Sequence, residues 1–360
     1  MKKIAFVCFL SLILISCGDK YFTLDAEELV LPESFVEIDH EPLNLNIMGS
    51  NDLIIYDTLM FVITSNPDGH LYVFSTNTKR LLMQLCKQGR ASNEFMQPFF
   101  SAKQILANNS SILLPLVNNA TQLKVVNISE SLKTGNTIVE YTEPHPFVSD
   151  ASVLIGDSEG DRLIAWDPRS DNPFEGPIHA PKIEYKNKDK VLKTYRFFPK
   201  LMETEQDFEV LNLCAWTTRK QPEGDLIVQT FYRMGYLLIT NYKTGESKAI
   251  HIAGTPTFDD YISKDNLPGR YFGDVVVTKN RIIAIYLGGS SIRESIVPQH
   301  ILIFDLAGNL LSSAFLGKDV AIHSIAYDEN TKTLYAADIM KDTMCTFDIS
   351  KLMTSNDSAD

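Results

Sequence analysis

The chain has 360 residues, enough for one long repeat domain or for two smaller domains, each with a substantial hydrophobic core. Its formal net charge is −12 at pH 7, and no three lysine or arginine residues stand in succession. Because a nucleic-acid surface needs clustered positive charge to meet the phosphates, this composition argues against a nucleic-acid partner.

The first predicted element is an export signal at the N-terminus. Two lysines precede an almost wholly apolar run over residues 4–15, which suits a signal sequence and falls short of the roughly 20 residues that span a bilayer. The sequence Leu-Ile-Ser-Cys at residues 14–17 resembles a bacterial lipobox, in which the cysteine receives lipid and the chain is cut just before it. We therefore expect residues 1–16 to be a lipoprotein signal peptide and Cys17 to be the lipid attachment site. An ordinary secretory signal with a chance cysteine is the alternative.

The residues after this cysteine predict where the protein is held. Gly18 stands where lipoproteins retained in the inner membrane often carry aspartate, so we expect the outer membrane, with the periplasmic or surface side left open. Each methylene of an attached acyl chain that enters the bilayer contributes about 0.8 kcal/mol, so more than one chain makes a stable anchor. Residues 17–33 are expected to be the lipidated tether.

Beyond the tether, short apolar strands alternate with polar turns in six successive copies. The first copy contains the strands LMFVIT (59–64), HLYVFS (70–75) and LLMQLC (81–86). The repeat length of roughly 50 residues, with four strands per copy, is that of a propeller blade. A further strand precedes most copies, for example residues 43–49 before the first and 209–216 before the fourth.

These copies predict an all-β fold, a six-bladed β-propeller of four-stranded antiparallel blades. The turns agree with it, because sequences such as NYKTGES combine an early asparagine with a later glycine, as hairpins require. No stretch has a sustained helical period. A two-domain β-sandwich is the structural alternative.

The two ends of the repeat predict how the ring closes. The sixth copy lacks its fourth strand, because a polar tail at residues 353–360 follows its third. An extra strand-like segment, SFVEIDH at residues 34–40, lies upstream of the first copy. An open ring would leave an unpaired strand edge. We therefore expect residues 34–40 to complete the sixth blade and the propeller to extend over residues 34–352.

The joint after the first copy, KQGRASNEF at residues 87–95, carries a family resemblance. Together with the lipobox and the six copies it resembles the TolB-like six-bladed β-propeller lipoproteins of Gram-negative gut bacteria, which often have G-x-G-P-x-E-F here. Gly89, Glu94 and Phe95 match this pattern, whereas an alanine and a serine replace its second glycine and its proline. The resemblance implies the fold more than a function. We expect Phe95 to be buried between blades and Glu94 to cap nearby backbone, rather than a phosphate loop.

The remaining patterns predict neither a metal nor a cofactor. The seven histidines are scattered singly, with no HExxH and no paired His/Cys spacing for zinc. Cys86, Cys214 and Cys345 each lie in an apolar run, which favours buried thiols over one disulfide with one free thiol.

Loop acids keep an enzyme open as the alternative function. Carboxylate pairs for glycoside chemistry meet in space and can be far apart in sequence. The candidate acids are Asp171, Glu175, Asp259 and Asp260. An exported carbohydrate-active enzyme with carboxylates at the propeller centre would place two such acids around the channel, with the pKa of one of them raised.

Three long loops predict a binding surface on one face of the ring, where the loops between second and third strands meet those between blades. They cover residues 166–182, 253–272 and 287–300. Loops on a rigid scaffold often carry function, and Arg and aromatic side chains are frequent anchors of binding surfaces. The candidate ligand-binding residues are Arg90, Trp166, Arg169, His179, Tyr232, Arg233, Arg270, Tyr271, Arg293 and His300. We therefore predict a membrane-anchored, non-catalytic module that binds a protein, peptide or glycan.

Overall fold

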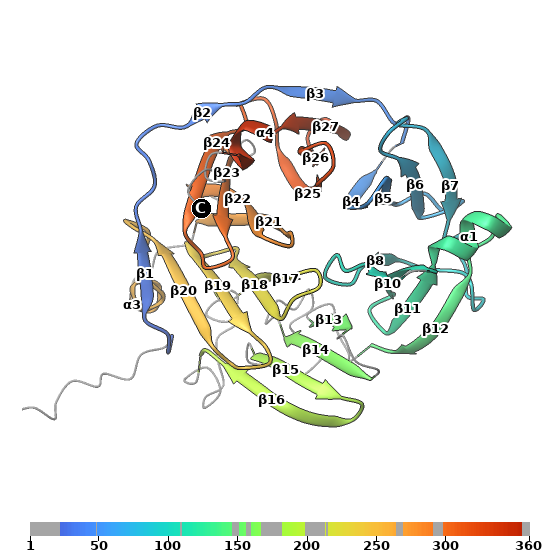
Figure 1. Cartoon of the computed structure of the whole chain (residues 1–360), viewed down its shortest axis with the longest axis horizontal. Coiled ribbons are helices and arrows are strands. Elements are labelled where there is room, and N and C mark those ends of the chain that lie inside the picture. The colour runs from blue at the N-terminus through green and yellow to red at the C-terminus, as the bar shows by residue number, and fades with distance from the viewer. Residues whose placement is uncertain are drawn as a thin grey trace, which may run out of the picture.

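The computed structural model shows six small sheets arranged around a common axis (Figure 1). It describes residues 22–47, 49–108, 110–145, 151–155, 160–166, 182–198, 213, 215–263, 269–290 and 298–354. Each sheet has four or five strands, and the blades follow one another in chain order. The predicted six-bladed β-propeller is therefore confirmed.

The strands of each blade run from the axis outward in chain order. Blade one contains β4 (Ser50–Tyr56), β5 (Leu59–Thr64), β6 (Leu71–Ser75) and β7 (Leu81–Leu85). Blade two contains β8 (Pro98–Phe100) with β9 (Leu106–Ala107), β10 (Ile112–Asn118), β11 (Gln122–Asn127) and β12 (Val139–Pro144). Blade three contains β13 (Ala151–Ile155), β14 (Asp161–Trp166), β15 (Lys182–Asn187) and β16 (Lys190–Arg196). Blade four contains β17 (Trp216–Lys220), β18 (Leu226–Phe231), β19 (Tyr236–Asn241) and β20 (Ser247–Ile252). Blade five contains β21 (Arg270–Val277), β22 (Arg281–Ser290), β23 (His300–Asp305) and β24 (Leu310–Phe315). Blade six contains β25 (Ile322–Asp328), β26 (Thr333–Asp338) and β27 (Thr343–Asp348).

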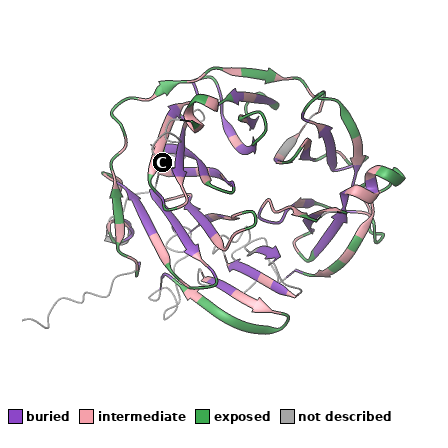
Figure 2. Cartoon of the chain, in the orientation of Figure 1, coloured by how far each residue is buried: buried purple, intermediate pink, exposed green. Residues whose placement is uncertain are grey.

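The middle strands of the blades form the core because neighbouring blades cover both of their faces. β5 and β6 are buried along almost their whole length, whereas the outer strand β16 is exposed along most of its residues. Figure 2 shows the same gradient from buried inner strands to exposed outer ones. This packing explains why the middle strands read as continuous apolar runs rather than as an alternating pattern.

Two predicted inner strands are wrong in position. The inner strand of blade one is β4, which follows the predicted residues 43–49, and that of blade four is β17, which begins where the predicted 209–216 ends. In blade one two apolar segments follow one another, the predicted residues 43–49 and Asp52–Tyr56. The second contains the buried pair Leu53 and Ile54 and forms the strand. A short apolar run alone therefore did not distinguish the blade strand from its connection.

In the described part of the chain, three short helices interrupt the all-β pattern. They are α1 (Ile128–Thr134), α3 (Phe258–Ser263) and α4 (Ser350–Met353). α1 connects the third and fourth strands of blade two and begins where the side chain of Asn127 accepts a hydrogen bond from the N–H of Glu130. It ends at Gly135, whose φ of 73° supplies the left-handed cap. The caps thus define a helix too short for its period to stand out in the sequence.

The N-terminal segment forms a strap, residues 22–43, around the outside of three blades (Figure 1). Its strand β1 (Ala26–Leu29) pairs in parallel with β20, and β2 (Val36–Glu37) pairs in parallel with β24. Its last strand, β3 (His40–Leu43), pairs antiparallel with β27 and is the fourth strand of blade six. The prediction that an N-terminal strand closes the ring is confirmed.

The limits predicted for this closure are corrected. Residues 40–43, not 34–40, complete blade six, because residues 36–37 already pair with blade five. The predicted tether at residues 17–33 also includes β1, where Glu27 lies 2.8 Å from Lys248 and Glu28 lies 2.7 Å from His251. The folded part therefore begins nearer the N-terminus than predicted.

Candidate functional site

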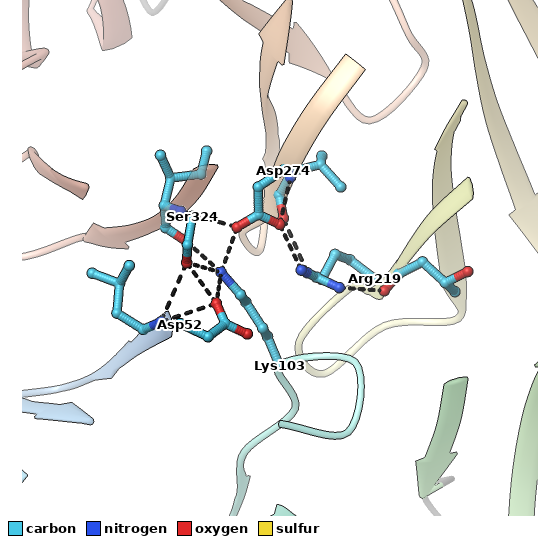
Figure 3. A network of polar contacts seen from close by, with 9 residues as sticks. Asp52, Lys103, Arg219, Asp274 and Ser324 are labelled. Carbon is cyan, nitrogen blue, oxygen red and sulfur yellow. Dashed lines mark hydrogen bonds and ion pairs between the residues drawn. The ribbon is translucent and has the colours of Figure 1, made fainter. Parts of the chain in front are cut away.

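A polar network joins the inner ends of five blades near the axis (Figure 3). Its members are Asp52 on β4, Lys103 between β8 and β9, Arg219 on β17, Asp274 on β21 and Ser324 on β25. Lys103 Nζ lies 2.7 Å from both Asp52 Oδ1 and Ser324 Oγ, and it also forms an ion pair with Asp274. Arg219 Nη2 lies 2.5 Å from the second oxygen of Asp274. Two cations and two carboxylates therefore neutralise one another at the centre of the ring.

Lys103 reaches the axis because the inner strand of blade two is interrupted by a turn. Ala102 and Lys103 have φ values of 48° and 52°, and the N–H of Gln104 donates to the carbonyl of Ser101 at 3.1 Å. Each non-glycine residue in this left-handed region costs about 1–3 kcal/mol, which the surrounding contacts must offset. The next residue, Gln104, exchanges two hydrogen bonds with the backbone of Ile155 at 2.7 and 2.8 Å, so the same turn also links blade two to blade three.

The electrostatics of Asp274 oppose a role as a proton donor. Burial alone would raise the pKa of this carboxyl, but the charges of Lys103 and Arg219 outweigh it and hold the pKa below its usual range. Its oxygens also accept from the N–H groups of Val275 and Ile325, both at 2.9 Å. The carboxylate is therefore ionised and fully engaged, unlike the acid of a carboxylate pair, whose pKa must be raised.

A cavity of about 780 Å³ occupies the channel beside this network. Its wall includes Lys103 and Arg219 at the inner end and the turns between first and second strands, such as Asp57 and Lys279, at the outer end. We call the side with these turns the hairpin face and the opposite side, with the loops between second and third strands, the loop face. The cavity thus opens on the hairpin face, whereas the predicted binding residues belong to the loop face.

On the loop face, the structure brings four predicted residues together between blades four and five. We call Tyr232, Arg233, Arg270 and Tyr271 the Arg233 cluster. Tyr232 and Arg233 form the turn after β18, and Arg270 and Tyr271 begin β21. The N–H of Tyr271 donates to the carbonyl of Tyr232 at 2.9 Å, and the Arg233 guanidinium lies 5.0 Å from the centre of the Tyr232 ring. Main-chain pairing therefore holds the two tyrosine–arginine pairs side by side.

Two nitrogen atoms of the Arg233 guanidinium lack hydrogen-bond acceptors within the described part of the chain. Its Nε and Nη1 atoms are buried there without a partner. Burial lowers the pKa of Arg233, and the nearby charge of Arg270 acts in the same direction, although a guanidinium remains charged at neutral pH. A buried donor without an acceptor costs about 1–3 kcal/mol, and more when it is charged. An anionic group from outside the chain would remove this cost.

Tyr271 differs from the prediction in its exposure. Its ring is buried at 6% exposure, and its hydroxyl lies 3.0 Å from that of Tyr261 on α3. A glycine is required beside it, because a Cβ at Gly289 would meet the Tyr271 ring at 2.9 Å. Tyr271 therefore supports the cluster from beneath and does not present its ring to a ligand.

The other predicted site residues lie apart from this cluster. Trp166 ends β14 and donates through Nε1 to Glu184 at 3.1 Å, while Arg90 is exposed in the joint after blade one. His300 begins β23 and packs against Phe35 of the strap with ring centres 4.2 Å apart, so it stabilises the strap contact. The predicted residues that lie outside the described part are Cys17, Arg169, His179 and Arg293, together with the candidate acids Asp171 and Glu175.

The joint at residues 87–95 has the predicted structural role. Phe95 is fully buried, and Glu94 Oε2 accepts from the N–H of Ala91 at 2.9 Å. A Cβ at Gly89 would lie 1.9 Å from this carboxylate, so glycine is needed there for the approach. Lys124 of blade two donates to the carbonyl of Glu94 at 2.7 Å and fastens the joint.

The cysteines are the remaining groups that could react or bind a metal. Cys86 and Cys345 are buried and free, and burial raises the pKa of both thiols, which leaves them inert; Cys214 lies outside the described residues. Within the described ranges, no three His, Cys, Asp or Glu residues gather to hold a metal. No helix in those ranges is long and apolar enough to span a membrane.

Comparisons with known proteins agree with the fold. No family model matches the chain, and no curated protein matches it in sequence. Among solved structures, a Bacteroides fragilis protein whose name proposes that it is exported is similar, with a TM-score of 0.51 and 12% identity over 87% of this chain and 93% of that chain. A DUF4221 family member from Bacteroides vulgatus has a TM-score of 0.53 and 9% identity over 88% of this chain and 98% of that chain. These likenesses support the fold alone.

Proposed function

We propose that this protein is exported, anchored in the outer membrane through lipid on Cys17, and binds a protein, peptide or glycan on its loop face without catalysing a reaction. The lipobox and the TolB-like pattern at residues 87–95 support export and anchoring. The name of the similar Bacteroides fragilis protein points the same way.

The observation that carries the binding role is the Arg233 guanidinium, with two buried N–H groups that lack acceptors in the described part. A guanidinium offers its donors in a planar fork that matches carboxylate, sulfate or phosphate. The ring of Tyr232 beneath it restricts its orientation. The ligand therefore carries an acidic group, which Arg233 binds.

The alternative, an exported carbohydrate-active enzyme with carboxylates at the centre, is less well supported. The described acids near the axis, Asp52 and Asp274, both form ion pairs with Lys103. Asp274 has a lowered pKa and accepts from four donors. Protonating either carboxylate would remove one of the two negative charges that balance the cations Lys103 and Arg219.

Capture from a cell-envelope extract and from a glycan array tests this proposal, with Arg233→Ala compared with the parent chain. We expect Arg233→Ala to reduce capture at least tenfold at an unchanged melting temperature. Lys133→Ala, an exposed cation on α1 of blade two, is the matched control and should keep full capture. Equal capture by Arg233→Ala would overturn the binding site. Cleavage of a polysaccharide by the purified parent chain would favour the enzyme.

A further inference from the structure

The start of the strap fixes which face lies near the proposed lipid anchor. The ring of Phe22 is buried against Phe198, Phe231 and Tyr236, with ring centres 5.1, 6.4 and 5.4 Å away. Phe231 ends β18 and Tyr236 begins β19, so Phe22 packs at the turn between these strands. That turn contains Tyr232 and Arg233. The strap therefore starts at the loop face, next to the Arg233 cluster.

The distance from this point to the anchor is short. Cys17 precedes Phe22 by five residues, and an extended chain spans at most about 3.6 Å per residue, so the two Cα atoms are separated by no more than about 18 Å. Arg233 follows Phe231 by two residues, which adds at most about 7 Å. A lipid on Cys17 would thus hold the loop face, and Arg233 with it, at the surface of the membrane. The cavity on the hairpin face would point away.

The charge of the Arg233 cluster selects among the anions of such a surface. Arg270 lies close enough for its charge to lower the pKa of Arg233, and the hydrogen bond between Tyr271 and Tyr232 holds the two arginines side by side. A phosphate monoester carries about −1.5 to −2 charges at pH 7 and three acceptor oxygens, whereas a phosphodiester carries one charge. The chain as a whole has a net charge of −12, which opposes a general attraction to an anionic bilayer. Only a local, stereospecific contact fits.

We infer that the Arg233 cluster binds the phosphate monoester headgroup of a membrane amphiphile, with the loop face against the bilayer to which the protein is anchored. This inference rests on the proposed function, because the lipid on Cys17 provides the orientation. The Arg233 fork binds two phosphate oxygens.

Vesicle flotation tests the inference with the chain from residue 18 onward, which keeps every described residue and has no lipid of its own. The vesicles contain phosphatidylcholine alone, or with phosphatidic acid or phosphatidylglycerol at equal mole fraction. We expect binding to phosphatidic acid at least tenfold tighter than to phosphatidylglycerol, and no binding to phosphatidylcholine alone. Arg233→Ala should lose this preference, and Arg233→Lys, which keeps the charge without the fork, should retain only part of it. Lys133→Ala is the control, and melting curves verify folding.

The remaining outcomes separate this inference from the proposed function. Equal binding of phosphatidic acid by Arg233→Ala and the parent chain overturns the inference. Binding of inorganic phosphate in solution without vesicle binding also overturns it, because the anion then does not come from the membrane. If neither probe binds while capture of a protein or glycan still depends on Arg233, the inference fails and the proposed function stands. Failure of both vesicle binding and capture rejects both.

Discussion

Lys103 of blade two forms an ion pair with Asp274 of blade five, and both side chains are only 6% exposed. The contact joins blades that are not neighbours in the ring, since blades six and one lie between them on one side and three and four on the other. Lys103 also meets Asp52 of blade one and Ser324 of blade six. A single buried lysine therefore connects four blades.

Lys103→Met should destabilise the fold strongly. Removing one partner of a buried ion pair leaves the other charge uncompensated and typically costs about 3–5 kcal/mol. Urea unfolding followed by circular dichroism measures the change, with Lys133→Met as the exposed control. The double variant Lys103→Met/Asp274→Asn should recover part of the lost free energy of unfolding. If the free energy of unfolding of Lys103→Met lies within about 1 kcal/mol of that of the parent chain, the network has no structural role.

Shortening the strap should lower the melting temperature in two steps. A chain that starts at residue 30 loses β1 and the buried ring of Phe22, whereas one that starts at residue 44 also loses β2 and β3. We expect the second to melt at a lower temperature than the first, because β27 then becomes an open edge and blade six is incomplete. Calorimetry of both chains measures the difference. If both chains melt at the same temperature, the pairing of β3 with β27 contributes no measurable stability.

His300 should make the strap contact sensitive to acid. Burial among aromatic rings lowers the pKa of His300, whereas histidine in the unfolded chain titrates near about 6.5. The unfolded state therefore takes up the proton first, and stability is lost as pH falls from about 6.5 towards the folded pKa. His300→Phe removes this loss. Its melting temperature, relative to that of the parent chain, should rise between pH 7.5 and pH 5, and parallel curves would refute the effect.

Cys17→Ala should prevent lipid attachment, because the lipobox reaction requires the thiol at this position. Cells that express the parent chain or the variant are labelled with a radioactive fatty acid. Only the parent chain should carry label and partition with membranes. Label in the variant at the level of the parent would show that lipid is attached elsewhere, and with it the orientation inferred for the loop face would be lost.

The repeat was predictable because most strands are bounded by turn residues. β25, β26 and β27 lie almost where the apolar runs place them, since each run ends at Asp or Asn. The strap register was not predictable, because its three strands are short and two of them add to blades that are already complete. Their pairing depends on a path in space that no local pattern encodes.

The Arg233 cluster and the central polar network also differ in how far the sequence predicts them. Tyr232 and Arg233 were expected on the loop face because propeller topology assigns loops to faces, and the structure places them there beside Arg270. The central network was missed because its members are far apart in sequence and each is a single polar residue. A signal exists in hindsight, since Asp52 and Asp274 each stand directly before a buried apolar run. Each acid lies within an inner strand, and its side chain joins the network near the axis.

The pairing of β3 with β27 has a consequence for how the chain is made. Leu43 emerges before any blade exists, and its partner Met344 follows only after five blades and the first two strands of the sixth. Loop closure over such a separation is slow compared with the formation of local hairpins. Each blade can therefore fold as it emerges, whereas the strap must wait. A chain that stops early keeps an uncovered strand, and completion of the ring distinguishes full-length molecules from fragments.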